Sequence, residues 1–180
     1  MKMQTRAGVG AITAILLGLV IGSLAYAVYA AVHTALRDTG QKGVAVATQH
    51  ASGRFEVKLV APGAPDKAEG STLGRMSIDK EYHGGLEATA KGEMLTAGTE
   101  VKGSAAYVAI ERATGILNGR AGSFVLQHSG TLTRGAPEQN ITVVPDSGTG
   151  QLVGLAGKLT VLIEDGKHSY EFQYTLPAAP

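Results

Sequence analysis

The chain has 180 residues, among them 16 Lys and Arg, 15 Asp and Glu, 25 Gly and no Cys or Trp. Without cysteine, the sequence excludes a disulfide scaffold, a thiolate metal site and a cysteine nucleophile. Its formal net charge of +1 provides no field that would hold a polyanion, so we expect no nucleic acid partner.

The first predicted element is a hydrophobic helix within residues 1–33. Lys2 and Arg6 are the charged residues of this segment, and residues 7–32 carry no charge. At about 1.5 Å per residue, a helix of that length reaches roughly 39 Å, which exceeds the roughly 30 Å hydrocarbon core of a bilayer. This length favours an uncleaved signal-anchor, whereas the small residues at 25–30 also suit a signal-peptide cleavage site.

The charges that precede the apolar run indicate that the N-terminus stays inside and the rest of the chain crosses the membrane. We therefore expect a single-pass protein of the cytoplasmic membrane with its C-terminal domain outside, or a secreted protein if the helix is cleaved. Residues 34–53 are mixed and polar, contain Gly40 and Gly43 and show no strong period, so we interpret them as a linker.

Residues 54–177 form the predicted folded domain. Apolar residues recur there at every second position, which is typical of strands with one buried and one wet face. Phe55, Val57 and Leu59 alternate with charged residues, and the clearest alternation runs from 168 to 176. Further strand-like runs lie at residues 76–83, 86–94, 105–112, 122–132, 141–144 and 152–163.

Turn residues separate several of these runs. Asn118-Gly119 and Asp165-Gly166 suit the positive φ angles of a type I′ hairpin turn. We therefore predict an all-β domain of about eight antiparallel strands, joined mostly by hairpins and closed into a barrel. A β-sandwich built from the same strands is the alternative.

Sequence motifs support no specific reaction. Residues 148–154 resemble a dinucleotide-binding loop, but the third glycine of that motif would fall at Val153. The sequence has no nucleophile elbow, and none of its five histidines pairs with another at metal-ligand spacing. We therefore expect neither a metal nor a cofactor, and we favour a non-enzymatic role while leaving an enzyme open.

Polar residues that alternation places on apolar strand faces are the candidates for a ligand site. His128 shares a face with Phe124, and Lys80 lies between Ile78 and Tyr82. If a barrel turns such faces inward, an apolar cavity with a few convergent polar groups results, which is typical of a small-molecule site. The simpler interpretation is that each is a core residue with one satisfied hydrogen bond. The residues chosen as cavity candidates are Tyr107, Glu111, His128, His168 and Tyr170.

Four segments, at residues 107–112, 117–130, 143–157 and 166–170, resemble the bacterial domain-of-unknown-function family 3224. Members of that family are similar in fold to allene oxide cyclase and dirigent proteins, which are eight-stranded antiparallel barrels and often oligomeric. The resemblance thus implies a closed barrel that forms a homo-oligomer. Family members usually carry a Trp in the first strand, which this chain lacks. The family has no established activity, so the resemblance implies a fold and not a chemistry.

These features predict a membrane-tethered, exported β-barrel that binds a small, largely apolar ligand. One alternative is a cyclase- or isomerase-like enzyme in which Glu111 or His128 polarises a bound substrate, because cyclisation needs mainly an enforced conformation and one polar group. The other is a structural, oligomeric envelope module. Its contacts would come from the less polar second faces of the strands, at Val108, Ile110, Val125 and Leu162.

Overall fold

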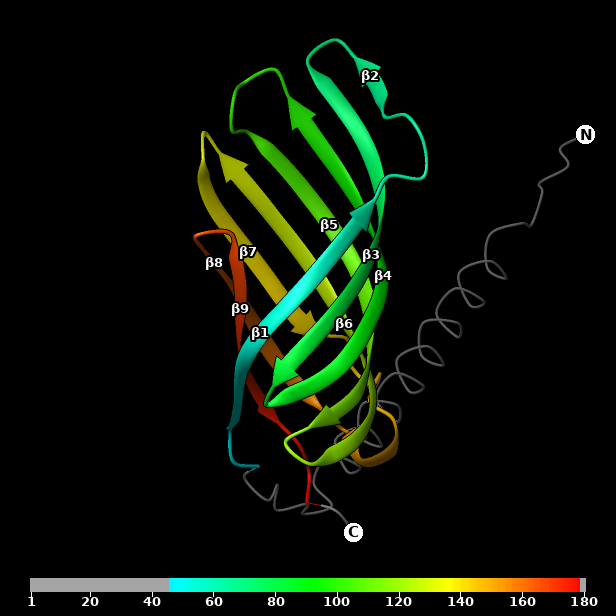
Figure 1. The fold of residues 1–180 in the computed structure, drawn as a ribbon, viewed down its shortest axis with the longest axis vertical. Helices are drawn as coiled ribbons and strands as arrows, with labels where there is room; N and C mark the ends of the chain where they lie inside the picture. Colours follow the sequence, from blue (N-terminus) through cyan, green and yellow to red (C-terminus); the bar gives the residue numbers. More distant parts are fainter. Residues whose placement is uncertain (1–45, 179–180) are drawn as a thin grey trace, which may run out of the picture. The chain divides into compact units, whose positions relative to one another are not determined.

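The computed structural model describes residues 46–178, which form a closed antiparallel β-barrel (Figure 1). Eight strands, β1 and β3 to β9, make the barrel wall, which confirms the all-β barrel predicted from the alternation. The elements are β1 (Gln49–Val60), β2 (Asp66–Ala68), β3 (Ser71–Gly84), β4 (Leu86–Thr99), β5 (Ala105–Leu117), β6 (Arg120–Thr133), β7 (Ala136–Val143), the 3-10 helix η1 (Gly150–Leu152), β8 (Ala156–Glu164) and β9 (Lys167–Thr175).

Pairing of β1 with two strands closes the barrel. Strands β3 to β9 pair in sequence order, each with the next, and β1 pairs with β9 on one side and β3 on the other. The short β2 pairs with the first residues of β3, beyond the point where β1 ends. Because each wall strand has a partner on both sides, the wall leaves no long unpaired edge.

Strand β1 starts earlier than the alternation indicated. Residues 49–53, the last part of the expected linker 34–53, pair with residues 174–170 of β9. Ala51 is the one buried side chain among them, so the segment has too few apolar residues to show a period. The predicted N-terminal helix and most of the linker lie outside the described residues. Among residues 46–178, no helix has the length and apolar character that crossing a membrane requires.

Both predicted hairpin turns have the expected backbone. Asn118 and Gly119 have φ angles of 45° and 84°, and Asp165 and Gly166 have φ angles of 49° and 75°. Two successive central residues with positive φ are what a type I′ turn requires, and this turn matches the twist of the strands that it joins. The turn chemistry of the sequence therefore sets two of the hairpins that build the wall.

Aromatic and leucine side chains fill the half of the barrel near the β3–β4 and β5–β6 turns. The rings of Phe124 and Phe172 stack with centroids 5.8 Å apart. The Tyr170 hydroxyl accepts a 2.8 Å hydrogen bond from the backbone N–H of Leu86, which ties β9 to the β3–β4 turn. The most deeply buried large side chains are Tyr82, Tyr170, Tyr174, Phe124, Phe172, Leu86, Leu117, Leu126, Ile141, Leu152, Leu155 and Leu159.

Candidate functional site

The opposite half of the barrel contains an unfilled space, which we call the inner hollow. It has a volume of about 320 Å³ and lies toward the β6–β7 and β8–β9 hairpins. This volume is at the lower end of the range of small-molecule pockets. The apolar residues that line it are Phe55, Val57, Leu59, Ile78, Met94, Ala109, Leu132, Pro137, Ile141, Val161 and Ile163.

Four polar side chains gather at the floor of the inner hollow, and we call Lys80, Tyr82, Glu111 and His128 the floor cluster. The Lys80 ammonium lies 3.0 Å and 2.9 Å from the two carboxylate oxygens of Glu111. It also donates a 3.2 Å hydrogen bond to the Tyr82 hydroxyl, which in turn donates one of 2.7 Å to Glu111 Oε1. Lys80 and His128 line the hollow, whereas Glu111 is fully buried, with 0% of its surface exposed.

The absence of a side chain at Gly92 explains how Lys80 and Glu111 meet. Lys80 lies on β3 and Glu111 on β5, with β4 between the two strands, and Gly92 of β4 pairs with Glu111. A Cβ at Gly92 would come within 2.7 Å of both the Cα and the Cβ of Glu111. Because Gly92 has no Cβ, the Glu111 side chain can cross β4 on the inner face and reach Lys80.

Glu111 is held as a carboxylate. Burial by itself would raise the pKa of Glu111, but contact with His128, the charge of Lys80 and the Tyr82 hydroxyl outweigh it and lower the pKa to about 2. Burial and the Glu111 charge raise the pKa of Tyr82 well above its ordinary 10.0, so Tyr82 remains a hydrogen-bond donor. Seen from the hollow, the negative charge of Glu111 therefore lies behind the positive charge of Lys80.

His128 has the loosest contact in the floor cluster. Its Nε2 lies 3.3 Å from Glu111 Oε1. This contact lowers the pKa of Glu111 together with the Lys80 charge and the Tyr82 hydroxyl. Within the described residues, Glu111 Oε2 has the Lys80 ammonium at 2.9 Å as its contact, whereas His128 Nε2 has no hydrogen-bond partner. Buried polar atoms are normally paired, so an unpaired one in a hollow indicates a missing partner.

The structure brings together three of the five candidates chosen from the sequence. Tyr107 lines the inner hollow, and Glu111 and His128 belong to its floor. His168 packs against the Phe55 ring at 5.1 Å and lines a separate hollow at the rim. Tyr170 points inward, as the alternation predicts, but it lies in the packed core and not at the inner hollow. Its hydroxyl accepts a hydrogen bond from the backbone there.

Lys80 and Tyr82 were not among the chosen candidates. Their signal was present in the sequence, because Lys80 alternates with Ile78 and Tyr82 and therefore shares their inward face. A lone lysine between apolar residues usually reaches solvent from a strand end, so only the pairing with Glu111 identifies it as part of a site.

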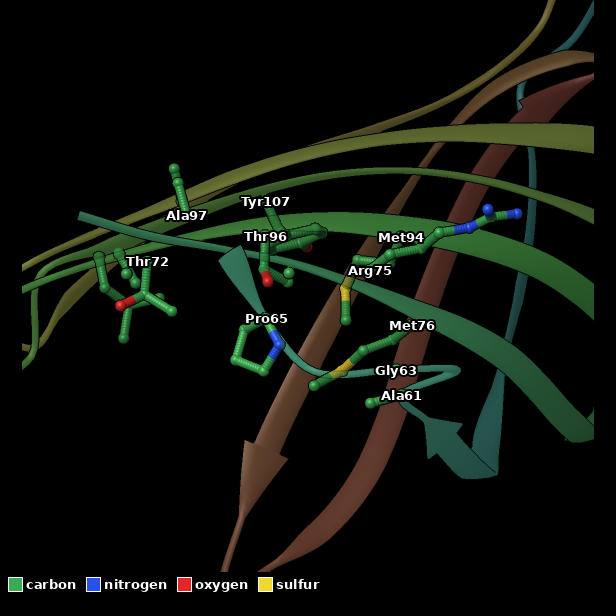
Figure 2. A pocket seen from close by; sticks show the side chains of 15 residues that line it. Ala61, Gly63, Pro65, Thr72, Arg75, Met76, Met94, Thr96, Ala97 and Tyr107 are labelled. Carbon is green, nitrogen blue, oxygen red and sulfur yellow. The ribbon is translucent and has the colours of Figure 1, made fainter. Parts of the chain in front are cut away.

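A second space adjoins the inner hollow, and we call it the outer hollow. It has a volume of about 450 Å³ and shares Met94, Tyr107 and Leu132 with the inner hollow. Figure 2 shows the side chains around it, among them Met76 and Pro65. The two hollows together form a mostly apolar path from the floor cluster to the end of the barrel.

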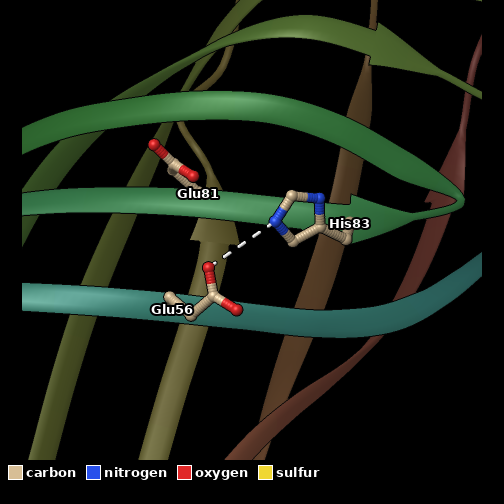
Figure 3. A group of neighbouring side chains, drawn as sticks. All are labelled: Glu56, Glu81 and His83. Atoms are coloured by element: carbon tan, nitrogen blue, oxygen red, sulfur yellow. Dashed lines mark ion pairs between the residues drawn. The ribbon is translucent and has the colours of Figure 1, made fainter.

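Glu56, Glu81 and His83 form a third group, on the outside of the barrel (Figure 3). Their potential ligand atoms lie within 4.8 Å of one another, although the sequence indicated no metal site. Both carboxylates are exposed, and His83 lies 3.7 Å from Glu56 and 3.3 Å from Glu87. Solvated ion pairs between neighbouring strands explain this arrangement, and no second observation points to a metal.

Comparison with known proteins agrees with this fold. The sequence profile described as "Protein of unknown function (DUF3224)" matches residues 51–174. The crystal structure of a protein with unknown function from the DUF3224 family of Shewanella oneidensis MR-1 is similar, with 48% sequence identity and a TM-score of 0.67. The match covers 74% of this chain and 100% of that chain, so a barrel of this kind folds without a further segment. No curated protein matches the sequence.

Proposed function

Because this chain belongs to the DUF3224 family of proteins of unknown function, we propose its function from the site alone: the barrel binds one small, largely apolar molecule in the inner hollow. The observation that carries this proposal is the uneven filling of the interior. One half is packed with aromatic and leucine side chains, whereas the other half leaves a partly open hollow of about 320 Å³ above a polar floor. Protein interiors are normally close-packed, so an apolar hollow with convergent polar groups is typical of a binding site.

Mass spectrometry of organic extracts from the purified full chain tests this proposal. We expect a small molecule that co-purifies in a defined ratio to the protein. The variant Ala109→Met, which places a larger side chain in the inner hollow, should lose that molecule. The matched variant Thr114→Met adds the same side chain on the exposed outer face of β5 and should retain it. Extracts without any such molecule, or equal retention by both variants, would contradict the proposal.

The cyclase- or isomerase-like alternative rests on the polar side chains that face the inner hollow. Glu111 is fully buried, so His128 and Lys80 are the groups of the floor cluster that could polarise a substrate directly. This alternative requires turnover. A co-purified molecule that is an isomer of an added precursor would support it, whereas a molecule recovered unchanged after prolonged incubation supports binding alone.

We also propose, from the uncharged residues 7–32, that the barrel is tethered on the outer side of the cytoplasmic membrane. The intact mass of the protein from membrane and soluble fractions tests this location. The uncleaved chain should be found in the membrane fraction. A soluble product that lacks roughly the first thirty residues would support the secreted alternative instead.

A further inference from the structure

We infer that the polar end of the bound molecule is a carboxylate or an equivalent anionic oxygen group, held by Lys80 and His128 at the floor of the inner hollow. This inference rests on the proposed function, because it names the chemical class of the ligand for the same site. Its ligand is an apolar monoanion that enters with its tail toward the outer hollow.

The first argument is the order in which donors and acceptors are arranged. The polar side chains that line the inner hollow include Lys80 and His128 of the floor cluster and also Tyr107. Burial and the Glu111 charge raise the pKa of Tyr107, so its hydroxyl stays protonated and able to donate. Of the two carboxylates of the hollow and its floor, that of Glu138 is on an exposed side chain, and that of Glu111 is fully buried behind these donors. A ligand therefore meets donors first, and its polar end must accept hydrogen bonds.

The second argument is charge. Lys80 carries three N–H donors, and its partners in the floor cluster are the Tyr82 hydroxyl and the Glu111 carboxylate. An anionic oxygen placed on the hollow side of this ammonium gains a charge-assisted hydrogen bond in a site of low dielectric. A ligand ammonium would instead face Lys80 before it could reach Glu111. A neutral hydroxyl could also accept a hydrogen bond from Lys80, but it would lack the charge–charge attraction that an anionic oxygen adds.

His128 supports the same class of ligand. The residue is 5% exposed and lines the hollow, and its Nε2 has no hydrogen-bond partner within the described residues. No hydrogen bond therefore fixes this nitrogen, which leaves it available to an oxygen of a ligand. The other titratable groups of the hollow and its floor are Tyr82, Tyr107, Glu138 and the Lys80–Glu111 pair.

The volume of the inner hollow limits the size of the ligand that it can hold. At about 30 Å³ for each water-sized group, a hollow of about 320 Å³ holds roughly ten non-hydrogen atoms. Octanoate has that number. A longer chain would continue past Met94 and Leu132 into the outer hollow, whose lining is also mainly apolar.

Isothermal titration calorimetry of the delipidated barrel, residues 46–180, with octanoate, 1-octanol and octylamine tests the inference. The three compounds share one alkyl chain and differ in the head group. We expect octanoate to bind at least about tenfold more tightly than the other two, because it adds a charge–charge attraction to the hydrogen bond with Lys80, whereas octanol makes the hydrogen bond alone and octylamine is repelled. Equal binding of octanol, or tighter binding of octylamine, would overturn this inference but not the proposed function. Binding of none of the three would count against both.

Variants of the floor cluster test whether its side chains cause the preference for octanoate over octanol. Lys80→Met combined with Glu111→Gln removes both charges together, so that no unpaired charge stays buried. Octanoate affinity should then fall to near that of octanol, whereas octanol affinity should change much less. The control Lys91→Met removes an exposed lysine from the outer face and should leave both affinities unchanged. If the double variant does not fold, His128→Gln should still weaken octanoate binding selectively. An unchanged preference for octanoate in a folded cluster variant would overturn the inference.

Discussion

At the scale of single residues, the Lys80–Glu111 pair is the most unusual feature of this barrel. Both side chains are buried, and ionised groups are rarely buried unless they are paired and hydrogen-bonded. The pair does not need to add stability to be retained, because a buried ion pair often contributes less than apolar residues of similar size. Its position at the floor of an apolar hollow is the feature on which the proposed ligand class rests.

The Lys80–Glu111 pair should make the stability of the barrel depend on pH in the acidic range. Glu111 has a pKa of about 2 in the fold, against an ordinary value of 4.5. A carboxyl whose pKa is lower when folded stabilises the native state above its unfolded pKa, and that stabilisation is lost as the pH falls through the folded pKa. We therefore expect roughly 3 kcal/mol of the free energy of unfolding to be lost between pH 4.5 and pH 2 on account of this residue.

Urea unfolding at a series of pH values measures this loss. Lys80→Met combined with Glu111→Gln keeps the other carboxylates and lacks this one, so its stability should fall less steeply over the same pH interval. If the free energy of unfolding fell equally with pH in the two proteins, Glu111 would not stabilise the fold as its low pKa requires.

At the scale of strands, β4 positions the floor cluster because it carries a glycine where Glu111 passes. Gly92→Ala should destabilise the barrel by about 1–3 kcal/mol, since the added Cβ would collide with the Glu111 backbone and Cβ. It should also weaken the binding of octanoate. Gly98→Ala is the matched control in the same strand, because the nearest atom to its Cβ, the Thr72 carbonyl oxygen, is 3.9 Å away. Equal unfolding free energies for the two variants would contradict this role of Gly92.

The seam between β7 and β8 is the weakest part of the wall. The two strands pair at Ile141–Leu159 and Thr142–Lys158. Beyond these pairs, the side chain of Gln139 makes the hydrogen bonds that a backbone partner would otherwise make. Its amide nitrogen donates to the Val161 carbonyl at 2.7 Å, and its amide oxygen accepts from the Val161 N–H at 3.2 Å. Because Gln139 also lines the inner hollow, this seam is where the wall of the site opens most easily.

Gln139→Ala should therefore speed hydrogen exchange of the Val161 amide and lower the free energy of unfolding by about 1–2 kcal/mol, the contribution of a lost side-chain hydrogen-bond pair. Gln173→Ala, an exposed glutamine on β9, is the control and should change neither quantity. Unchanged protection of Val161 in the Gln139 variant would show that the seam does not depend on this side chain.

At the scale of the whole molecule, the outer surface carries apolar side chains that a lone barrel would leave in water. Leu95, Val108 and Ile110 are 56%, 54% and 51% exposed, and Leu95 pairs directly with Val108 across β4 and β5. Contiguous exposed apolar residues on a sheet face are typical of contact surfaces. Self-association through the outer face of β4 and β5 therefore remains a prediction, as the sequence had indicated for Val108 and Ile110.

Light scattering of residues 46–180 tests this prediction. We expect a mass above that of one chain, which Val108→Lys should reduce to a monomer. Thr114→Lys adds the same charge farther along β5, outside the apolar group, and should leave the mass unchanged. A monomer at every concentration of the unmodified barrel would contradict self-association through this face.

The sequence by itself determined the class of fold and the direction of most side chains. Period-two alternation places His128 on the same face as Phe124 and Leu126, because successive side chains of a strand point to opposite faces. The alternation left the side of Glu111 open, since the other face of its strand carries Val108 and Ile110. The pairs Asn118-Gly119 and Asp165-Gly166 determined two hairpins because few other residues adopt positive φ at low cost. Tertiary structure alone decided which inward side chains meet. The height of a side chain along the barrel axis depends on how strands distant in sequence are staggered. This stagger separates Tyr170 from the floor cluster, and it brings Lys80 close to Glu111 across Gly92.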